Sequence, residues 1–392
     1  MSDVYVLDYV RTPRAKGSAK GSLHHRSPVD LVAGLQRALV SRGLDPGAVE
    51  DVIIGSASQV DEQGGNLARV ATLLAGWGDG VPGGTVNRFC ASGIDAVAQV
   101  AARIRTGEMD LAVAGGVESV SRVAMFSDRA PLWTDPATIA EVGSIHMGVA
   151  ADLNATIDGW TREELDAYAV ETHAKAALAW DRGDYANSVI PATRADGSVF
   201  DRDELIRPGT TMESLAKLPP AFADPAQDAI ALKAHPGVGA VEHLHTVGSS
   251  PALADGAALL VLGTSKSPIR LVASATAAVD PVIMLTAGQV AIEKVIAKAG
   301  LTPDDIDVWE FAEAFSALCL KLRRDLGPGP ERLNPSGGTI AMGHAFGATG
   351  AIMVGQCAEN LKRLGGRYGV ASVSGAAGLG VAVLIERVDV ST

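Results

Sequence analysis

The chain has 392 residues, of which 47% are hydrophobic and 20% are charged, and its formal net charge is −12. This composition excludes an intrinsically disordered chain and disfavours general binding to nucleic acid. An odd count of three cysteines disfavours a disulfide framework and favours a reducing, cytoplasmic compartment.

Short apolar runs alternate with amphipathic segments in the first third of the chain. The apolar runs predict strands at Val4–Asp8, Val52–Gly55, Thr85–Phe89 and Leu111–Ala114. Helical spacing predicts helices at Ser27–Arg42 and Gly93–Arg105. Strands that alternate with helices predict an α/β sheet whose strands are buried on both faces.

The chain changes character between about Met125 and His245, where prolines and charged residues become more frequent. Thr161 and Glu164 form a capping box before a long helix that runs to about Arg182. We interpret this region as an inserted domain of helices and loops. The α/β pattern then resumes, with a helix near 288–299 and strands near 270–273, 307–311, 370–373 and 381–385.

An internal repeat relates the two ends of the chain. The segment GGTVNRFCASG at Gly83–Gly93 aligns with GGTIAMGHAFG at Gly337–Gly347, so that Cys90 and His344 take the same position. A small-residue helix follows each segment, and then a strand, AVAGG in the first copy and ASVSG in the second. The repeat predicts two related halves, each with one reactive residue at a strand-to-helix junction.

Cys90 and His344 are the candidate catalytic pair. A cysteine at the start of a helix faces backbone N–H groups and the positive end of the helix dipole, which lower a thiol pKa. His344 lies between glycines and could take the proton of Cys90 as a general base. The alternatives are a buried, packed cysteine and a hydrogen-bonded structural histidine.

Five segments resemble thiolases, the family of acetyl-CoA acetyltransferases and 3-ketoacyl-CoA thiolases. These segments are NRFCASG, GGVESVSRVAM, DELIRPGTTMESLAKLPPAF, ADGAALLVL and GGTIAMGHAFGATGA. The resemblance implies a five-layer αβαβα fold built from two related halves. It also implies an N-terminal half over 1–124 completed by about 246–268, a loop domain over 125–245 that covers CoA, and a C-terminal half over 269–392.

The resemblance also assigns roles to individual residues. It implies that Cys90 is the acylated nucleophile, that His344 activates it, and that the N–H of Cys90 helps to form an oxyanion hole. It implies CoA contacts for Arg207, Ser214 and Leu218, although Arg207 could equally be a solvated surface arginine. Met147 matches a segment near the acyl pocket, with ordinary packing as the alternative.

Three positions depart from the family pattern. Ser374, in the run that continues to Gly378 and Gly380, stands where the family carries a second reactive cysteine, and a hydroxyl is a poor substitute for a thiol in proton transfer. Ala312, before Glu313, replaces the asparagine that holds a water in the family's second oxyanion hole. The run TVGSSPALADG replaces another family motif, in which Ser249 or Ser250 could still reach the pantetheine.

The remaining cysteines, Cys319 and Cys357, fit neither motif and are interpreted as packed residues. The stretch Ala223–His243 is longer than in short-chain thiolases, which indicates a larger substrate or an altered lid. Ala345 replaces the proline that usually follows the active-site histidine.

These observations leave three hypotheses about function. The first is a thiolase-type acyltransferase of fatty-acid metabolism that acts on acyl-CoA or 3-ketoacyl-CoA. The second is a thiolase-like acyl-CoA hydrolase, acyl-transfer partner or silent subunit without carbon–carbon cleavage, and the third is an acyl-CoA-binding subunit in which Cys90 is structural. We expect CoA as a substrate with no resident cofactor or metal, no signal peptide, no membrane or nucleic-acid partner, and a homodimer or homotetramer.

Overall fold

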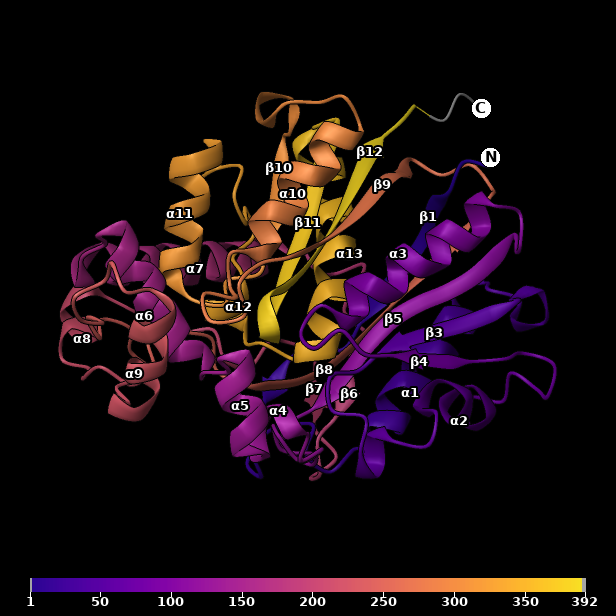
Figure 1. The fold of residues 1–392 in the computed structure, drawn as a ribbon. Coiled ribbons are helices and arrows are strands. Elements are labelled where there is room, and N and C mark those ends of the chain that lie inside the picture. Colours follow the sequence, from indigo (N-terminus) through magenta and orange to yellow (C-terminus); the bar gives the residue numbers. More distant parts are fainter. Residues whose placement is uncertain (1, 390–392) are drawn as a thin grey trace.

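The computed structural model describes residues 2–389, which form two halves with a similar order of elements (Figure 1). The N-terminal half contains β1 (Tyr5–Arg11), α1 (Pro28–Ser41), β3 (Asp51–Gly55), α2 (Leu67–Leu74), β4 (Gly84–Val86), α3 (Ser92–Arg105), β5 (Leu111–Ser119) and β8 (Ala254–Gly263). The C-terminal half contains β9 (Ile269–Ala278), α10 (Ala287–Lys298), β10 (Val308–Phe311), α11 (Ser316–Leu326), α12 (Thr339–Met342), α13 (Phe346–Leu364), β11 (Tyr368–Gly375) and β12 (Leu379–Arg387).

The strands of the two halves pair in the same way. The strand order is β1-β8-β5-β3-β4 in the first half and β9-β12-β11-β10 in the second. Beyond β10, Leu333 forms a single parallel bridge with Trp309. In each half the first three strands of this sheet order pair antiparallel to one another, and each later strand pairs parallel to the strand before it. The halves join where Tyr5 of β1 pairs with Arg270 of β9. The repeated pairing confirms the two related halves that the sequence predicts.

Helices cover the sheet in layers. On one outer side, α1 and α2 pack on the strands of the first half, and on the other α10 packs on β9, β11 and β12 (Figure 1). Between the halves lie α3, against β3 and β5, and α13, against β10 and β11, and these two helices contact each other. This arrangement confirms the five-layer αβαβα fold.

The chain between β5 and β8 forms the predicted set of helices and loops. It contains α4 (Pro131–Thr134), α5 (Pro136–Val142), α6 (Met147–Asp158), α7 (Arg162–Arg182), α8 (Met212–Ala216), α9 (Pro225–Ala234) and the short pair β6 (Ala192–Thr193) and β7 (Val199–Phe200). The capping box of Thr161 and Glu164 starts α7 as expected. The boundaries 125 and 245 remain a prediction.

Backbone contact between α3 and α13 brings the two halves together. Gly93 and Gly347 take the same position in the repeat, and a Cβ on Gly93 would lie 2.3 Å from the Gly347 carbonyl oxygen. A Cβ on Gly350 would lie 2.5 Å from the amide nitrogen of Ile94. Glycine is therefore required here because the two helix backbones leave no room for a side chain. The first turns of both helices consequently lie side by side.

Within residues 2–389, no helix is both long enough and apolar enough to cross a membrane. Cys319 and Cys357 are completely buried, on α11 and α13. Their burial confirms that these two cysteines are packed residues.

The contact between the helices makes a prediction about stability. Gly93→Ala should lower the free energy of unfolding by about 3 kcal/mol, because its Cβ overlaps the backbone of α13. Gly34→Ala in α1 is the matched control, since nothing lies within 4 Å of its added Cβ. That change should be neutral or stabilising by up to about 1 kcal/mol. Urea unfolding followed by circular dichroism measures both, and equal stabilities would contradict the role given to Gly93.

Candidate active site

Cys90 lies in the turn between β4 and α3. Phe89, just before it, has a φ of 50°, and Gly343, at the equivalent position before His344, has a φ of 91°. The Ser92 hydroxyl fixes the turn, because it accepts a hydrogen bond from the Arg88 N–H at 2.8 Å and donates one to the Phe89 carbonyl at 2.6 Å. The turn holds the Cys90 side chain at a cavity wall, where the residue is 8% exposed.

The electrostatic surroundings of Cys90 differ from the prediction. Burial, followed by the nearby Glu118 carboxylate, raises the pKa of the Cys90 thiol to about 12. The expectation that the helix start lowers this pKa is therefore wrong for the free protein, because desolvation exceeds the helix effect. Cys90 is a thiol at neutral pH and needs a base in order to react.

His344 is held at the start of α13 by its backbone and its ring. Its N–H donates to the Ala252 carbonyl at 2.9 Å, and its carbonyl accepts from the Ala254 N–H at 3.1 Å. The ring Nδ1 lies 2.8 Å from the Thr349 hydroxyl. Burial, and then the charge of Arg14, lower the pKa of His344 to about 4. His344 is therefore neutral at pH 7, and in the tautomer whose Nδ1–H donates to Thr349 its Nε2 can accept a proton.

Both residues line one cavity of about 390 Å³. Ser374, Met147, Arg207 and Ser250 line the same space. The side chains of Cys90 and His344 share this wall without a direct hydrogen bond in the described part of the chain. The repeat thus brings a thiol and a neutral imidazole to one cavity, as its symmetry predicts.

The hydroxyl of Ser374 is occupied by backbone groups. Ser374 Oγ donates to the Leu285 carbonyl at 2.7 Å and accepts from the Gly288 N–H at 2.9 Å. A Cβ on Gly288 would lie 2.7 Å from this oxygen, so the fit is close. The hydroxyl therefore ties the end of β11 to the start of α10, and its proton is committed to a carbonyl.

Ala312 and Glu313 are buried and hydrogen-bonded to other parts of the fold. Ala312 is buried and donates its N–H to the Ser372 carbonyl at 2.9 Å, and it is absent from the cavity wall formed by the described residues. The buried Glu313 carboxylate accepts hydrogen bonds from Tyr168 and Thr172 of α7 and from Asn334. Glu313 thus fastens the inserted helix α7 to the C-terminal half.

The predicted CoA residues separate into two groups. Arg207 is exposed at the cavity wall and Ser250 is buried in it, so both are placed to contact a ligand. Ser214 caps α8 by bonding to the Thr211 backbone, and Leu218 packs in the core around α6 and α7. Ser249 is fully buried and accepts from the Thr246 N–H, and none of these three is in the cavity lining that the described residues form.

Two further predicted residues shape the cavity differently. Met147 begins α6 and lines the cavity beside Cys90. Gly378 has a φ of 73° in the turn between β11 and β12, where a Cβ would lie 2.4 Å from the Val279 carbonyl oxygen. Gly378 therefore has a backbone role in the turn that follows Ser374.

Sequence reasoning missed Glu118, Thr349 and Arg14 as parts of the site. The Glu118 carboxylate is fully buried and accepts from the N–H groups of Ala57 at 2.8 Å and Gly347 at 2.9 Å. It therefore bridges the N-terminal half and the first turn of α13. A charged residue at the end of the apolar run LAVAGGV was the available signal.

Unusual backbone geometry concentrates around the cavity. Five non-glycine residues that line the cavity or its adjoining spaces have positive φ values. They are Phe89, Phe126, Met284, Phe346 and Ala377. Such conformations cost free energy and cluster at functional sites, which supports this cavity as the active site.

The fold and the paired site place this chain among α/β proteins with two like halves. Residues 4–266 match the N-terminal domain of thiolase, and residues 265–387 match the thiolase C-terminal domain. The chain is 35% identical to the β-ketoadipyl-CoA thiolase of Pseudomonas aeruginosa, over 98% of this chain and 99% of that protein. It is 37% identical to the 3-ketoacyl-CoA thiolase of Pseudoalteromonas translucida, over 99% and 100%.

The structural comparison agrees. The crystal structure of the Bacillus anthracis acetyl-CoA acetyltransferase is similar at a TM-score of 0.85 and 32% identity, with 99% of each chain covered. The chain belongs to the thiolase family, as its sequence motifs indicated.

The pKa of His344 makes a prediction about pH. Because His344 stays neutral down to about pH 4, acylation of Cys90 by acetyl-CoA should keep a constant rate from about pH 9 to pH 5. The rate should fall at lower pH as His344 gains a proton and loses its capacity as a base. Rapid-quench mass spectrometry after a pH jump measures this profile. A half-maximal point near pH 6.5 would contradict the lowered pKa.

The Thr349 hydroxyl is predicted to position His344. Thr349→Val removes the hydrogen-bond partner of Nδ1, so acylation should slow by about tenfold. This loss is a part of the rate enhancement of about 10²–10⁴-fold that a general base contributes. The acid limb of the pH profile should shift in the same variant. Thr339→Val is the control, since Thr339 is also buried and its hydroxyl has no hydrogen-bond partner among residues 2–389. Equal rates in the two variants would show that Thr349 does not position the ring.

Proposed function

We propose that this protein is an acyltransferase that acts on CoA thioesters, including 3-ketoacyl-CoA, through an acyl-enzyme on Cys90 with His344 as the base. The observation that carries the proposal is the pairing of Cys90 and His344 at equivalent helix starts on one cavity wall. The names of the related thiolases support the substrate class.

The proposed chemistry begins with proton transfer. The Cys90 thiol proton moves to Nε2 of His344, whose Nδ1 is held by Thr349. The thiolate attacks the thioester carbonyl carbon and forms a carbon–sulfur bond, and the bond to the CoA sulfur breaks. The departing CoA thiolate takes the proton from His344, so that charge and protons balance.

Substrate contacts follow from the cavity. The exposed guanidinium of Arg207 is placed to bind a phosphate or nucleotide group of CoA. Further inside, the Ser250 hydroxyl donates to the Thr246 carbonyl at 2.9 Å, so its oxygen is available to a ligand as an acceptor. CoA thus enters as a substrate and leaves as a product. The assignments of Ser214, Leu218 and Ser249 remain predictions of the family resemblance, as do the cytoplasmic location and the homodimer or homotetramer.

A second candidate function is acyl transfer or hydrolysis without carbon–carbon cleavage. Cleavage of a 3-ketoacyl-CoA leaves a carbanion on the acetyl-CoA portion, and an acid must protonate it. The Ser374 proton is bonded to the Leu285 carbonyl, and Ala312 offers no polar side chain. These two positions favour a protein that forms the acyl-enzyme but cleaves carbon–carbon bonds slowly.

Two measurements test the proposal and separate the candidates. Intact-protein mass spectrometry after exposure to acetyl-CoA should show an adduct that Cys90→Ala abolishes. Absence of the adduct would refute the acyltransferase and favour a subunit that only binds acyl-CoA.

Cleavage of acetoacetyl-CoA by CoA then separates the two enzymatic candidates. The second candidate predicts that cleavage is at least about 100-fold slower than acylation, since general acid catalysis of this kind contributes a rate enhancement of about 10²–10⁴-fold. The double substitution Ala312→Asn with Ser374→Cys should restore cleavage while the acylation rate stays within threefold of the original, about 0.6 kcal/mol. Rapid cleavage by the unsubstituted protein would show that the two departures are not disabling.

A further inference from the structure

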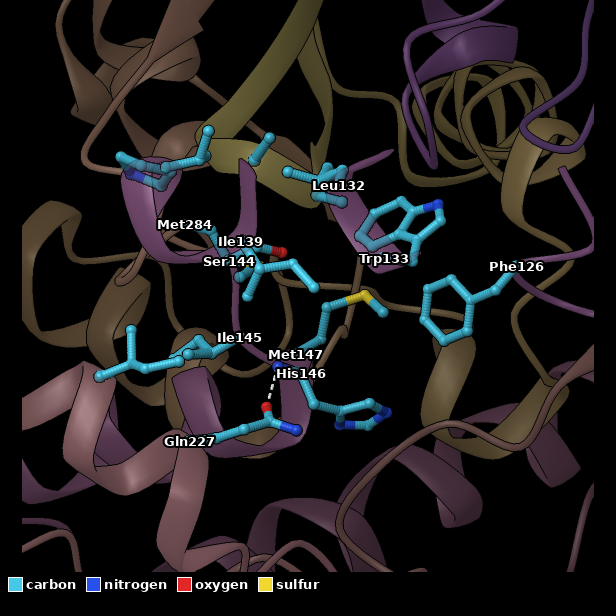
Figure 2. A pocket seen from close by; sticks show the side chains of 15 residues that line it. Phe126, Leu132, Trp133, Ile139, Ser144, Ile145, His146, Met147, Gln227 and Met284 are labelled. Carbon is cyan, nitrogen blue, oxygen red and sulfur yellow. Dashed lines mark hydrogen bonds between the residues drawn. The ribbon is translucent and has the colours of Figure 1, made fainter. Parts of the chain in front are cut away.

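A second cavity, of about 220 Å³, lies beyond Cys90 between the inserted helices and the end of β11. We call it the side pocket and show it in Figure 2. Its walls are mostly apolar, and the main contributors are Phe126, Leu132, Trp133, Ile139, Ile145 and Met284. An apolar cavity of about 150 Å³ accommodates benzene, so the side pocket has room for a ring or a chain of about six carbons.

The side pocket adjoins the catalytic cysteine. A small space lined by Cys90 also has Phe126, Trp133, Met147 and Ala376 in its wall, and these four line the side pocket as well. Figure 2 shows Trp133 and Phe126 close together beside Met147, and their ring centroids are 4.8 Å apart. The entrance from Cys90 is therefore framed by aromatic rings and a methionine.

The two cavities lead away from Cys90 in different directions. The larger one passes Ser250 and Val247 to the exposed Arg207, where the charged end of CoA is proposed to bind. The side pocket instead extends among α4, α5 and α9. A thioester with its CoA portion beside Arg207 and its carbonyl at Cys90 would therefore direct its acyl tail toward the side pocket.

The side pocket offers no charge to an acyl tail. Its polar members are Ser144, His146 and Gln227, and no lysine or arginine is in the wall that residues 2–389 form. The Gln227 amide oxygen accepts from the His146 N–H (Figure 2), and its NH₂ group donates to Asp224. Burial lowers the pKa of His146, which keeps its ring neutral. Asp128, in the small space beside Cys90, would repel a second carboxylate.

We infer, on the basis of the proposed acyl transfer, that the side pocket is the acyl-tail site and selects neutral hydrocarbon tails of about six carbons or more, straight or cyclic, over tails that end in a carboxylate. Burial of the tail supplies the affinity. A carboxylate in this pocket would lose its water without gaining a cation. Gln227 and Ile230 of α9 belong to the long stretch 223–243, whose length indicated a larger substrate or an altered lid.

Binding to a Cys90→Ala protein tests the site without depending on the reaction. Calorimetry should show hexanoyl-CoA binding at least about tenfold more tightly than acetyl-CoA, because several methylene groups become buried. Adipoyl-CoA, which has the same six-carbon chain with a terminal carboxylate, should bind no more tightly than acetyl-CoA. Similar affinities for all three thioesters would overturn the inference, and so would equal affinities for hexanoyl-CoA and adipoyl-CoA.

Substitutions in the same background place the tail in the side pocket. Ser144→Trp fills the pocket and should remove the preference for hexanoyl-CoA while leaving the affinity for acetyl-CoA within threefold. Ile139→Arg adds a cation to the wall and should shift the preference by at least tenfold toward adipoyl-CoA. Ala140→Arg is the matched control, because Ala140 is the exposed neighbour of Ile139 on α5 and does not line the pocket.

The results distinguish this inference from the proposed function. If hexanoyl-CoA keeps its advantage in Ser144→Trp, or if Ala140→Arg matches Ile139→Arg, the tail lies elsewhere and the side-pocket assignment is wrong. Acylation of Cys90 in the unsubstituted protein is measured separately by mass spectrometry. Its absence would refute the acyl transfer, whereas the binding series decides on the tail site.

Discussion

Close contact between two helix backbones positions the two proposed catalytic residues of this protein. Gly93 and Gly347 occupy equivalent positions, and the first turns of α3 and α13 meet so closely that a Cβ on Gly93 would overlap the Gly347 carbonyl oxygen, while a Cβ on Gly347 would overlap Ser56 and Gly55 at the end of β3. Cys90 and His344 each lie two residues before the start of one of these helices, so the contact brings both to the same cavity. The layers of the fold and the inserted helices surround this contact between α3 and α13.

The same contact buries Cys90 and His344 and thereby changes the pKa of both side chains. A thiol and an imidazole buried between two halves are both driven toward their neutral forms, because desolvation penalises either charge. Glu118 adds to this effect on Cys90 while its carboxylate holds the two halves together. The thiol and the imidazole are therefore both neutral in the free protein at pH 7, and the proposed reaction must itself supply the charge separation.

The sequence predicted the fold more completely than the site. Apolar runs and the repeat predicted most strands of both halves and the shared position of Cys90 and His344, because these features depend on local pattern. The central strand β8 was not among the predicted strands. The lowered thiol pKa was a wrong prediction, since a helix start is visible in sequence but the depth of burial is not. The bonding of Ser374 to Leu285 and Gly288 could not be predicted either, because it joins segments that lie far apart in the chain. The side pocket is a similar case, with walls from α4, α5, α9 and the turn after β11.

The place of β1 in the sheet has a consequence for how the chain folds during synthesis. β1 pairs with β8 and touches β9, and β8 also pairs with β5. The N-terminal half therefore lacks a central strand until the ribosome has made the whole insertion and reached Gly263. Contacts of such long sequence separation close late and slowly. A nascent chain that ends within the insertion exposes the apolar edges of β1 and β5, and is a natural client for chaperones.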